Sequence, residues 1–184
     1  IKQEFLLSYF LHAKLCYLIF NETNTAFLSA QEGAKRNEKY SKCLYGYFIS
    51  HGIGTKKDFE KGIEIMLESG AENYYEKFST DFGIYYFKVK RDENKSFYWF
   101  EKAFNMRKTK ASINNYGICL MKGIRIDKNI EKAEEIFSIG VNQNDLNSMY
   151  HLAFIREKTN LEESLKLYRK AAKQGHPESM YQLG

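Results

Sequence analysis

The side chains able to do nucleophilic or metal chemistry are spread thinly along this chain. The candidates are Cys16, Cys43, Cys119, His12, His51, His151 and His176. The cysteines lie far apart and lack the C-x-x-C spacing of zinc or redox sites. The histidines fall in separate segments, which is typical of loop or exposed-face residues rather than of ligands. We therefore predict no catalytic, metal or cofactor site, and a nucleophilic pair of Cys119 with His151 stays open as an alternative.

A glycine-rich segment, His51-Gly-Ile-Gly, is the next candidate for chemistry, because glycine loops can hold phosphate. Such a loop follows a strand and ends in Lys followed by Ser or Thr. Gly52 and Gly54 have neither context. Glycine adopts positive φ without steric cost, so the segment instead predicts a tight turn.

Residues 78–107 combine aromatic and basic side chains, a pattern that can bind single-stranded nucleic acid. A structural interpretation is favoured, because the aromatic residues recur at helical spacing and Asp92, Glu93 and Glu101 dilute the charge. The net charge of +5, from 28 basic and 23 acidic residues, is also spread along the chain rather than concentrated on one segment. Nucleic-acid binding is kept as the less favoured alternative.

The elements that position these residues are predicted best from residues 41–73. Ser41, Tyr45 and Ile49 form one stripe of an amphipathic helix, and the glycine turn follows. Asp58 can cap a second helix, predicted from Phe59 to about Glu72 and closed by a left-handed Asn73. A helical hairpin of this kind, about 36 residues long, cannot bury its apolar face alone and needs neighbours.

Three columns of residues repeat at this period. The predicted helix-ending positions are Asn37, Asn73, Arg107, Asn144 and Gly175. The small residues of the first helices are Gly46, Gly83, Gly117, Ala153 and Gly184. The small residues of the second helices are Ala26, Gly62, Ser96, Ala133 and Ser164. Small side chains let two helices approach closely, so the columns predict a row of about five helical hairpins.

These columns resemble the Sel-one-like repeats, relatives of the tetratricopeptide repeats. Gly46, Gly52, Gly54 and Asp58 fall on that family's three glycines and aspartate, and residues 168–175 read like its second-helix signature. The resemblance extends from about residue 24 onward. It implies an all-α fold, a right-handed α-α superhelical solenoid of about five helix-turn-helix repeats. Ordinary tetratricopeptide repeats match less well because they lack the glycine-rich loop.

The chain departs from the family pattern in its loops. Arg125 replaces the second loop glycine and Asn129 replaces the aspartate. The hairpin loops around Lys90 and Lys158 are too short for the glycine motif. We expect those two hairpins to turn more tightly.

We expect residues 1–184 to form a single solenoid, a fragment of a longer chain, because the sequence lacks an initiating Met and stops inside a first helix. The expected repeats cover residues 1–37, 38–73, 74–107, 108–144 and 145–175, with another beginning at 176. The apolar run of residues 5–20 is interrupted by His12 and Lys14 and falls short of the roughly 20 residues of a membrane span. It predicts a buried first helix and no transmembrane segment.

The unpaired cysteines favour a reduced, cytoplasmic setting, and the endoplasmic reticulum lumen stays open. No proline-rich or serine-rich linker divides the chain.

A binding surface is predicted on the first helices. It comprises the positions two before, one after and two after the small residue, which we expect to face away from the core. These residues are Leu44, Tyr47, Phe48, Asp81, Ile84, Tyr85, Asn115, Ile118, His151 and Ile155, with Cys119 and Phe154 at equivalent positions. The resemblance implies that first helices line the concave side of the solenoid. Many of these residues are apolar, which is typical of surfaces that capture a peptide or helix.

The predicted function is a non-catalytic scaffold or adaptor that binds an extended or helical segment of a protein partner. Members of the Sel-one-like repeat family, which this chain resembles, act in ubiquitin-ligase complexes of protein quality control, in chitin synthase activation and in bacterial host interaction. A regulatory or substrate-docking module of a larger enzyme or membrane complex is therefore the alternative.

Overall fold

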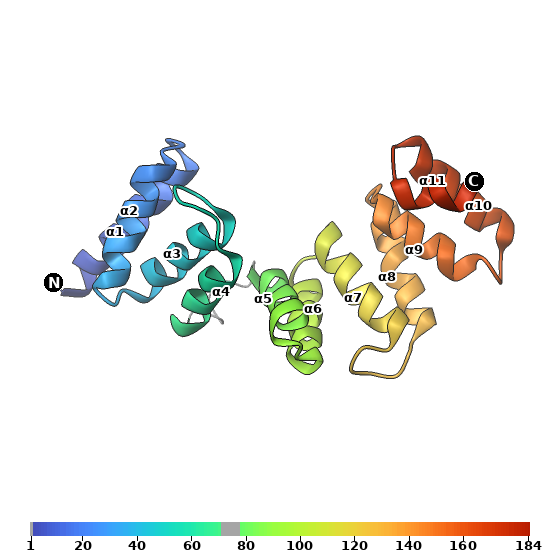
Figure 1. The fold of residues 1–184 in the computed structure, drawn as a ribbon, viewed down its shortest axis with the longest axis horizontal. Coiled ribbons are helices and arrows are strands. Elements are labelled where there is room, and N and C mark those ends of the chain that lie inside the picture. The colour runs from blue at the N-terminus through green and yellow to red at the C-terminus, as the bar shows by residue number, and fades with distance from the viewer. Residues whose placement is uncertain (1, 71–77) are drawn as a thin grey trace. The chain divides into compact units, whose positions relative to one another are not determined.

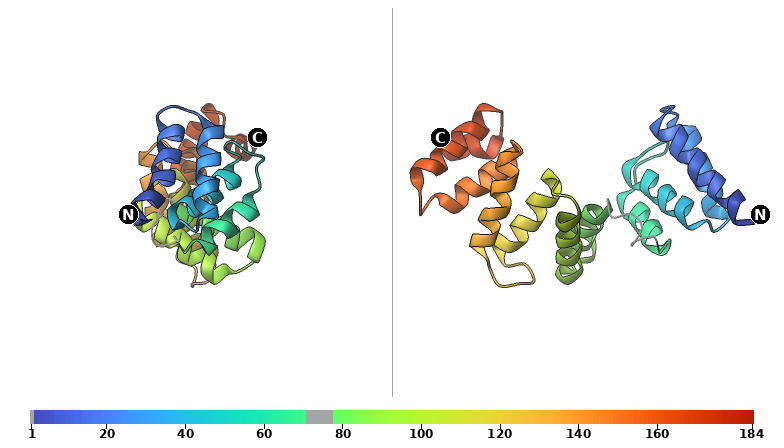
Figure 2. Two further views of the ribbon diagram at one scale, coloured as in Figure 1. Left: turned by 90° about the vertical axis from the view of Figure 1, so that its left-hand side faces the viewer. Right: turned by 180° about the vertical axis from the view of Figure 1, so that it is seen from behind.

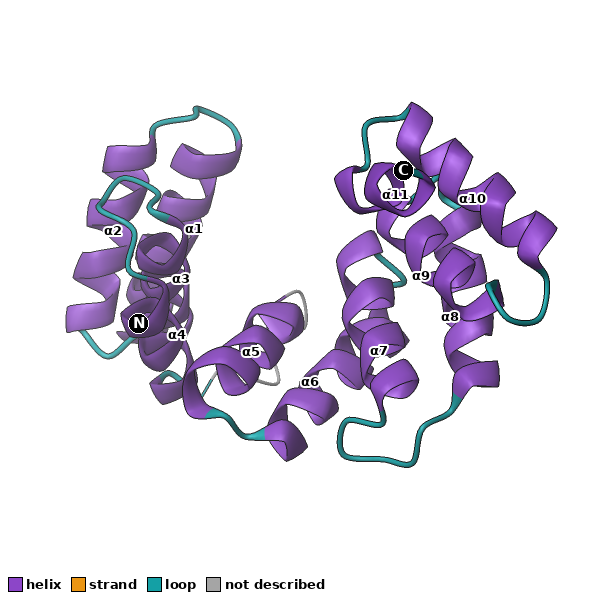
Figure 3. Ribbon diagram, turned by 45° about the vertical axis from the view of Figure 1, so that its right-hand side comes forward, coloured by secondary structure: helices purple, strands orange, loops and turns teal. Residues whose placement is uncertain are grey.

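The computed structural model describes residues 2–70 and 78–184, and every regular element in that part of the chain is helical (Figures 1 and 3). The predicted all-α fold class is confirmed. The chain divides into two compact units, Ile1–Glu76 and Lys77–Gly184. In each unit, helices that follow one another in sequence pack as antiparallel pairs, as the further views in Figure 2 also show.

The first unit holds two hairpins. Its helices are α1 (Lys2–Leu18), α2 (Thr23–Lys35), α3 (Lys39–His51) and α4 (Phe59–Glu68). Helix α3 packs against α2 on one side and α4 on the other, and it also reaches α1. The buried core between α1, α2 and α3 comprises Ala13, Cys16, Ala26, Ala30, Leu44 and Phe48.

The second unit holds three hairpins and one further helix. Its helices are α5 (Ser79–Tyr85), continued by a π-helical turn η2 (Tyr86–Lys90), then α6 (Glu93–Met106), α7 (Lys110–Lys122), α8 (Ile130–Asn142), α9 (Leu146–Arg156), α10 (Leu161–Lys173) and α11 (Pro177–Leu183). One continuous core runs through α6 to α10, with Phe104, Tyr116, Phe137 and Tyr168 among its large side chains.

The hairpin turns follow the glycine pattern of the sequence. Gly52 and Gly54 both adopt positive φ, of 73° and 65°, before Asp58 caps α4 by accepting a hydrogen bond from the backbone N–H of Lys61 at 3.1 Å. The turns around Lys90 and Lys158 lack such a loop, and only residues 91–92 and 157–160 separate their helices. The expected tighter turns are confirmed.

Arg125 and Asn129 keep the geometry of the residues they replace. Arg125 adopts φ 70°, close to the value at Gly54, although it carries a side chain. Asn129 accepts a hydrogen bond from the backbone N–H of Lys132 at 2.9 Å, as Asp58 does in the earlier hairpin. The loop conformation is therefore preserved where its sequence signature is lost.

Helices end at four of the predicted positions. Asn37, Asn144 and Gly175 all have positive φ, of 58°, 54° and 85°. Arg107 also ends its helix, as predicted, but its backbone is extended at φ −148° rather than left-handed. A left-handed conformation brings Cβ against the following carbonyl oxygen, and Arg107 avoids this by leading in an extended form to Thr109, which caps α7.

The end of α4 also differs from its prediction. The helix stops at Glu68 rather than near Glu72, and Gly70 takes the left-handed conformation at φ 63°. Glycine has no Cβ penalty in that region, so the earlier glycine closes the helix. The predicted closing residue Asn73 lies outside the described residues.

The columns of small residues mark the closest approach of paired helices. A Cβ atom built on Gly46 would lie 2.6 Å from the carbonyl oxygen of Gly62, and one on Gly117 would lie 2.7 Å from the ring of Phe137. Ala26, Ser96, Ala133 and Ser164 are all fully buried. The small-residue columns are therefore sites of direct helix contact, as predicted.

Helix α1 is buried on only one side, so the expectation of a buried first helix is half wrong. Ala13 and Cys16 face α2 and α3, whereas Leu11 is 51% exposed and Leu15 is 46% exposed. In the described part of the chain, helix α1 packs mainly against α2 and α3, which leaves its other side open. Among the described residues, no helix has both the length and the apolar character to cross a bilayer.

Replacing Gly46 by Ala should lower the free energy of unfolding by about 1–2 kcal/mol. The exchange gains about 1 kcal/mol of helix propensity, but the added Cβ meets the backbone of α4, which cannot move aside as a side chain could. Urea denaturation followed by circular dichroism measures the change. The control is Lys61→Ala at an exposed site on α4, expected to change stability by less than about 0.5 kcal/mol. A Gly46→Ala protein as stable as the unmodified one would contradict the close approach.

Replacing Arg125 by Gly should raise the free energy of unfolding by about 1 kcal/mol. The gain comes from relieving the left-handed strain of a residue with a Cβ atom, less the entropy that glycine loses on folding. The same denaturation assay tests it against Asp127→Gly, a neighbouring residue outside the left-handed region, which should destabilise. Equal effects of the two substitutions would show that the loop at Arg125 carries no strain.

Candidate functional site

The positions one after the small residue are the accessible part of the predicted binding face. They are Tyr47, Ile84, Ile118 and Phe154. The first three are half-buried, and Phe154 is 50% exposed. One residue corresponds to about 100° of rotation around a helix, so these side chains point sideways from the contact with the paired second helix.

The positions two after the small residue are mostly buried. Phe48 is 0% exposed, and Tyr85 and Cys119 are each 1% exposed, so the expectation that they face away from the core is wrong. A first helix inside a row of hairpins contacts its own second helix on one side and the preceding hairpin on the other. Phe48 accordingly packs with Ala13 and Ala26 of the hairpin before it. Only Ile155 of this column is half-buried.

The positions two before the small residue also differ in how deeply they are buried. Leu44 is buried in the core of the first unit, again contrary to the expected exposure, whereas Asp81, Asn115 and His151 are half-buried. The ring of His151 stacks on Phe137 of α8, with centroids 4.9 Å apart. Helix α8 belongs to the preceding hairpin, so this column also packs between neighbouring repeats.

Three of the predicted residues meet at a cavity in the second unit. Ile84, Asn115 and Ile118 line a space of about 230 Å³. Its other lining residues are Phe87, Lys88, Phe100, Cys119, Lys122 and Ile124. The predicted residues Asp81, Tyr85, His151 and Ile155 do not line it, and Leu44, Tyr47 and Phe48 belong to the first unit.

The cavity is also lined by four residues that the repeat pattern did not predict, Phe87, Lys88, Lys122 and Ile124. Phe87 and Lys88 lie on η2, whose π-helical geometry no longer follows the 3.6-residue period of the columns. Lys122 and Ile124 flank Gly123, which ends α7 in the left-handed conformation and turns the chain back over the cavity. Apolar and basic residues lie next to each other at the ends of these two first helices, and this pattern could have indicated the cavity.

The electrostatics of this region argue against nucleophilic chemistry. Burial, with a smaller effect of the Glu93 carboxylate, raises the pKa of the Cys119 thiol to about 12. Burial and nearby cationic groups lower the pKa of His151 to about 4, and no hydrogen bond joins Cys119 to His151 in the described chain. A thiol with a raised pKa is a poor nucleophile at neutral pH. Within residues 8–70 and 78–184, no group of three or more His, Cys, Asp or Glu side chains could hold a metal ion.

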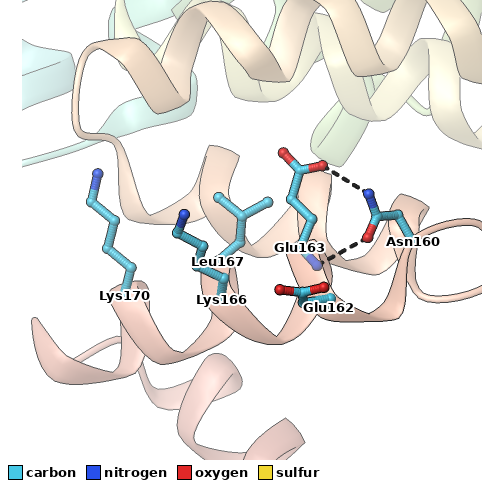
Figure 4. Close-up of a pocket in the computed structure, with 6 residues that line it drawn as sticks. All are labelled: Asn160, Glu162, Glu163, Lys166, Leu167 and Lys170. Carbon is cyan, nitrogen blue, oxygen red and sulfur yellow. Dashed lines mark hydrogen bonds between the residues drawn. The ribbon is translucent and has the colours of Figure 1, made fainter.

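A second hollow, of about 420 Å³, lies along α10 (Figure 4). Its six lining residues are Asn160, Glu162, Glu163, Lys166, Leu167 and Lys170. All come from α10 and the residue that caps it, where Asn160 accepts a hydrogen bond from the backbone N–H of Glu163 at 3.1 Å. Carboxylates and lysines alternate along one helix here, so the hollow is a solvated helix face rather than a site built between elements.

The sequence matches a family model described as Sel1 repeat. Four stretches match, residues 39–77, 81–107, 110–145 and 147–176, and together they cover most of the chain. The chain belongs to the Sel1 repeat family. The matched stretches correspond to the last four hairpins of the structure, and the hairpin of α1 and α2 precedes them.

Solved Sel1 repeat structures share this fold. A protective antigen of uropathogenic Escherichia coli strains, which displays an SLR fold, matches over 99% of this chain with a TM-score of 0.72 and 18% identity. A Sel1 repeat protein of Oxalobacter formigenes matches over 97% of this chain with a TM-score of 0.65 and 18% identity. The chain spans 41% of the first structure and 75% of the second. No curated protein matches the sequence.

Membership in this family bears on the kind of function. Sel1 repeats are typically protein–protein interaction modules, and the proteins that carry them are generally non-catalytic scaffolds.

The half-buried His151 of this Sel1 repeat chain should make stability depend on pH. Its folded pKa of about 4 lies below the unfolded value of about 6.5, so the unfolded chain binds more protons between those values. Stability should therefore fall as pH falls from 6.5 to 4, by about 2 kcal/mol through this residue. Denaturation of the unmodified chain and of His151→Gln at pH 7 and pH 4.5 measures it, and the variant should lose less. Equal losses would show that His151 is not held neutral.

Proposed function

We propose that this Sel1 repeat chain is a non-catalytic scaffold or adaptor that binds a segment of a partner protein on its first helices. The supporting observation is the cavity of the second unit, where Ile84, Asn115 and Ile118 from two first helices meet under accessible apolar surface. Helix surfaces that only contact solvent are ordinarily charged. Phe87 and Phe154, both exposed, add apolar area on first-helix elements of the same unit.

The physical basis of the proposed function is a surface formed before binding. The hairpins hold the binding side chains on packed helices, so the scaffold loses little conformational freedom when a partner docks. A few large apolar contacts usually carry most of the energy of such an interface. On the proposed face, these large apolar contacts would come from residues that remain accessible after the repeats pack together.

Some residues of the predicted binding surface are buried and cannot contact a partner. Leu44, Phe48, Tyr85 and Cys119 support the fold, and their replacement by charged residues would unfold it rather than test binding. The proposed contact residues are Tyr47, Asp81, Ile84, Asn115, Ile118, His151, Phe154 and Ile155, together with Phe87.

A regulatory or docking module within a larger assembly is the second candidate. The chain spans 41% of the protective antigen, so a fold of this kind can form part of a longer chain. Both candidate functions use the same binding face on the first helices. They differ in whether this chain acts as a separate scaffold or as part of a larger enzyme or membrane complex.

A crosslinking pull-down from native extract tests the proposed face. The test variant is Phe87→Glu with Phe154→Glu. The matched control is Tyr98→Glu with Leu161→Glu, which places two charges at exposed apolar sites on the second helices α6 and α10. Circular dichroism first establishes that both variants keep their helix content. We expect a partner that the unmodified chain and the control recover, and that the test variant loses.

Two results of the pull-down would contradict the proposal. Recovery of the same partner by the test variant would place binding outside the first helices. Recovery of nucleic acid alone, with a yield that collapses as salt rises, would replace the scaffold by a nucleic-acid-binding function.

A further inference from the structure

The cavity of the second unit has an apolar floor and a cationic rim. Ile84, Phe100 and Ile118 are buried or half-buried among its lining residues, and Cys119 is protonated and uncharged at neutral pH. Lys88 on η2 and Lys122 at the end of α7 also line the cavity, and both are exposed. The two ammonium groups therefore belong to the opening, while the apolar side chains form the interior.

The volume limits what the cavity can hold. At about 230 Å³ it is smaller than the roughly 300–1,000 Å³ of a small-molecule site. It suits a single large apolar side chain, the kind of group that anchors protein interfaces. Only one lining residue with an exposed aromatic ring, Phe87, could stack on a base, which disfavours single-stranded nucleic acid.

The charges around the opening select the kind of segment that carries the anchor. Among the described residues, neither Lys88 nor Lys122 forms an ion pair. The Glu93 carboxylate also acts on this region, through its effect on Cys119. Both lysines at the opening are cations without an ion-pair partner in the described part of the chain, and the chain as a whole carries +5. Complementary charge across an interface favours encounter with an acidic partner.

Asn115 adds a hydrogen-bonding group. Its half-buried side chain lines the cavity and makes no hydrogen bond with another described residue. A primary amide offers both donors and an acceptor, so it can bond the N–H and C=O of an extended backbone. An apolar side chain entering the cavity would carry its own backbone past this amide.

We propose that the cavity binds an acidic segment of a partner protein, in which one large apolar side chain enters between α5 and α7 and neighbouring Asp or Glu residues pair with Lys88 and Lys122. This proposal rests on the scaffold function proposed above and names the chemistry of its partner. Asn115 hydrogen-bonds the backbone of the bound segment.

The test begins with a library of random twelve-residue peptides selected against the folded chain at 150 mM salt. We expect the enriched peptides to share one Phe, Trp or Leu flanked by Asp or Glu. The best peptide is then synthesised, and calorimetry measures its affinity. Replacing its apolar anchor by Ala should weaken binding at least about tenfold. Raising the salt to 500 mM should weaken it further, because screening acts on the rim charges.

Matched protein variants locate the site. Lys88→Glu with Lys122→Glu should weaken binding of that peptide about tenfold or more. Lys110→Glu with Lys158→Glu changes the net charge equally at exposed sites that do not line the cavity, and should leave affinity within about twofold. Phe87→Ala should weaken binding, whereas Tyr98→Ala, an exposed aromatic residue on α6, should not.

Several outcomes would overturn this proposal. Enriched peptides without acidic residues, or an equal effect of the two charge-reversal pairs, would rule out the acidic partner. Enrichment of no peptide, or affinity unchanged by Phe87→Ala, would rule out the cavity as the site. Self-association of the chain that disappears in Lys88→Glu with Lys122→Glu would make a second copy the occupant. In each case, a pull-down partner lost by Phe87→Glu with Phe154→Glu would still support the scaffold function.

Discussion

The close approach of paired helices at small residues is the constraint on which the rest of this structure depends. Gly46 and Gly62 leave no room for a Cβ atom between α3 and α4, and Gly117 admits the ring of Phe137 between α7 and α8. Helices this close exclude water and bury apolar side chains on both flanks. Because each hairpin has apolar residues on its outer sides as well, it must also pack against its neighbours.

That double packing decides which residues can bind a partner. Phe48 and Cys119 point away from their own second helices, yet each is buried in packing with other helices. Only a narrow strip of each first helix stays accessible, and it carries Ile118 and Phe154. The π-helical turn after α5 widens the strip by bringing Phe87 and Lys88 to the cavity.

Polar side chains also hold neighbouring helices of the second unit together. Arg156 of α9 forms ion pairs with Glu134 of α8 and with Glu163 of α10, so one guanidinium joins three helices. It is only partly exposed, which shields these pairs from solvent and salt. His176 caps α11 by accepting a hydrogen bond from the backbone N–H of Ser179, so this histidine has a structural role. Lys88 and Lys122 contrast with these groups, because no ion pair within the described chain engages them.

The hairpins, their glycine turns and the columns of small residues could be predicted from the sequence, because each depends on local rules such as helical period, positive φ and capping. Asn144 and Asp58 could be assigned from residue type alone. Tertiary structure alone decided the burial of Phe48 and Tyr85, the extended exit at Arg107 and the cavity between α5 and α7. These features depend on which neighbouring helix covers a given face, and a repeating pattern states only that some neighbour exists. Burial is a property of the assembled row of hairpins, whereas helix formation is a property of the segment.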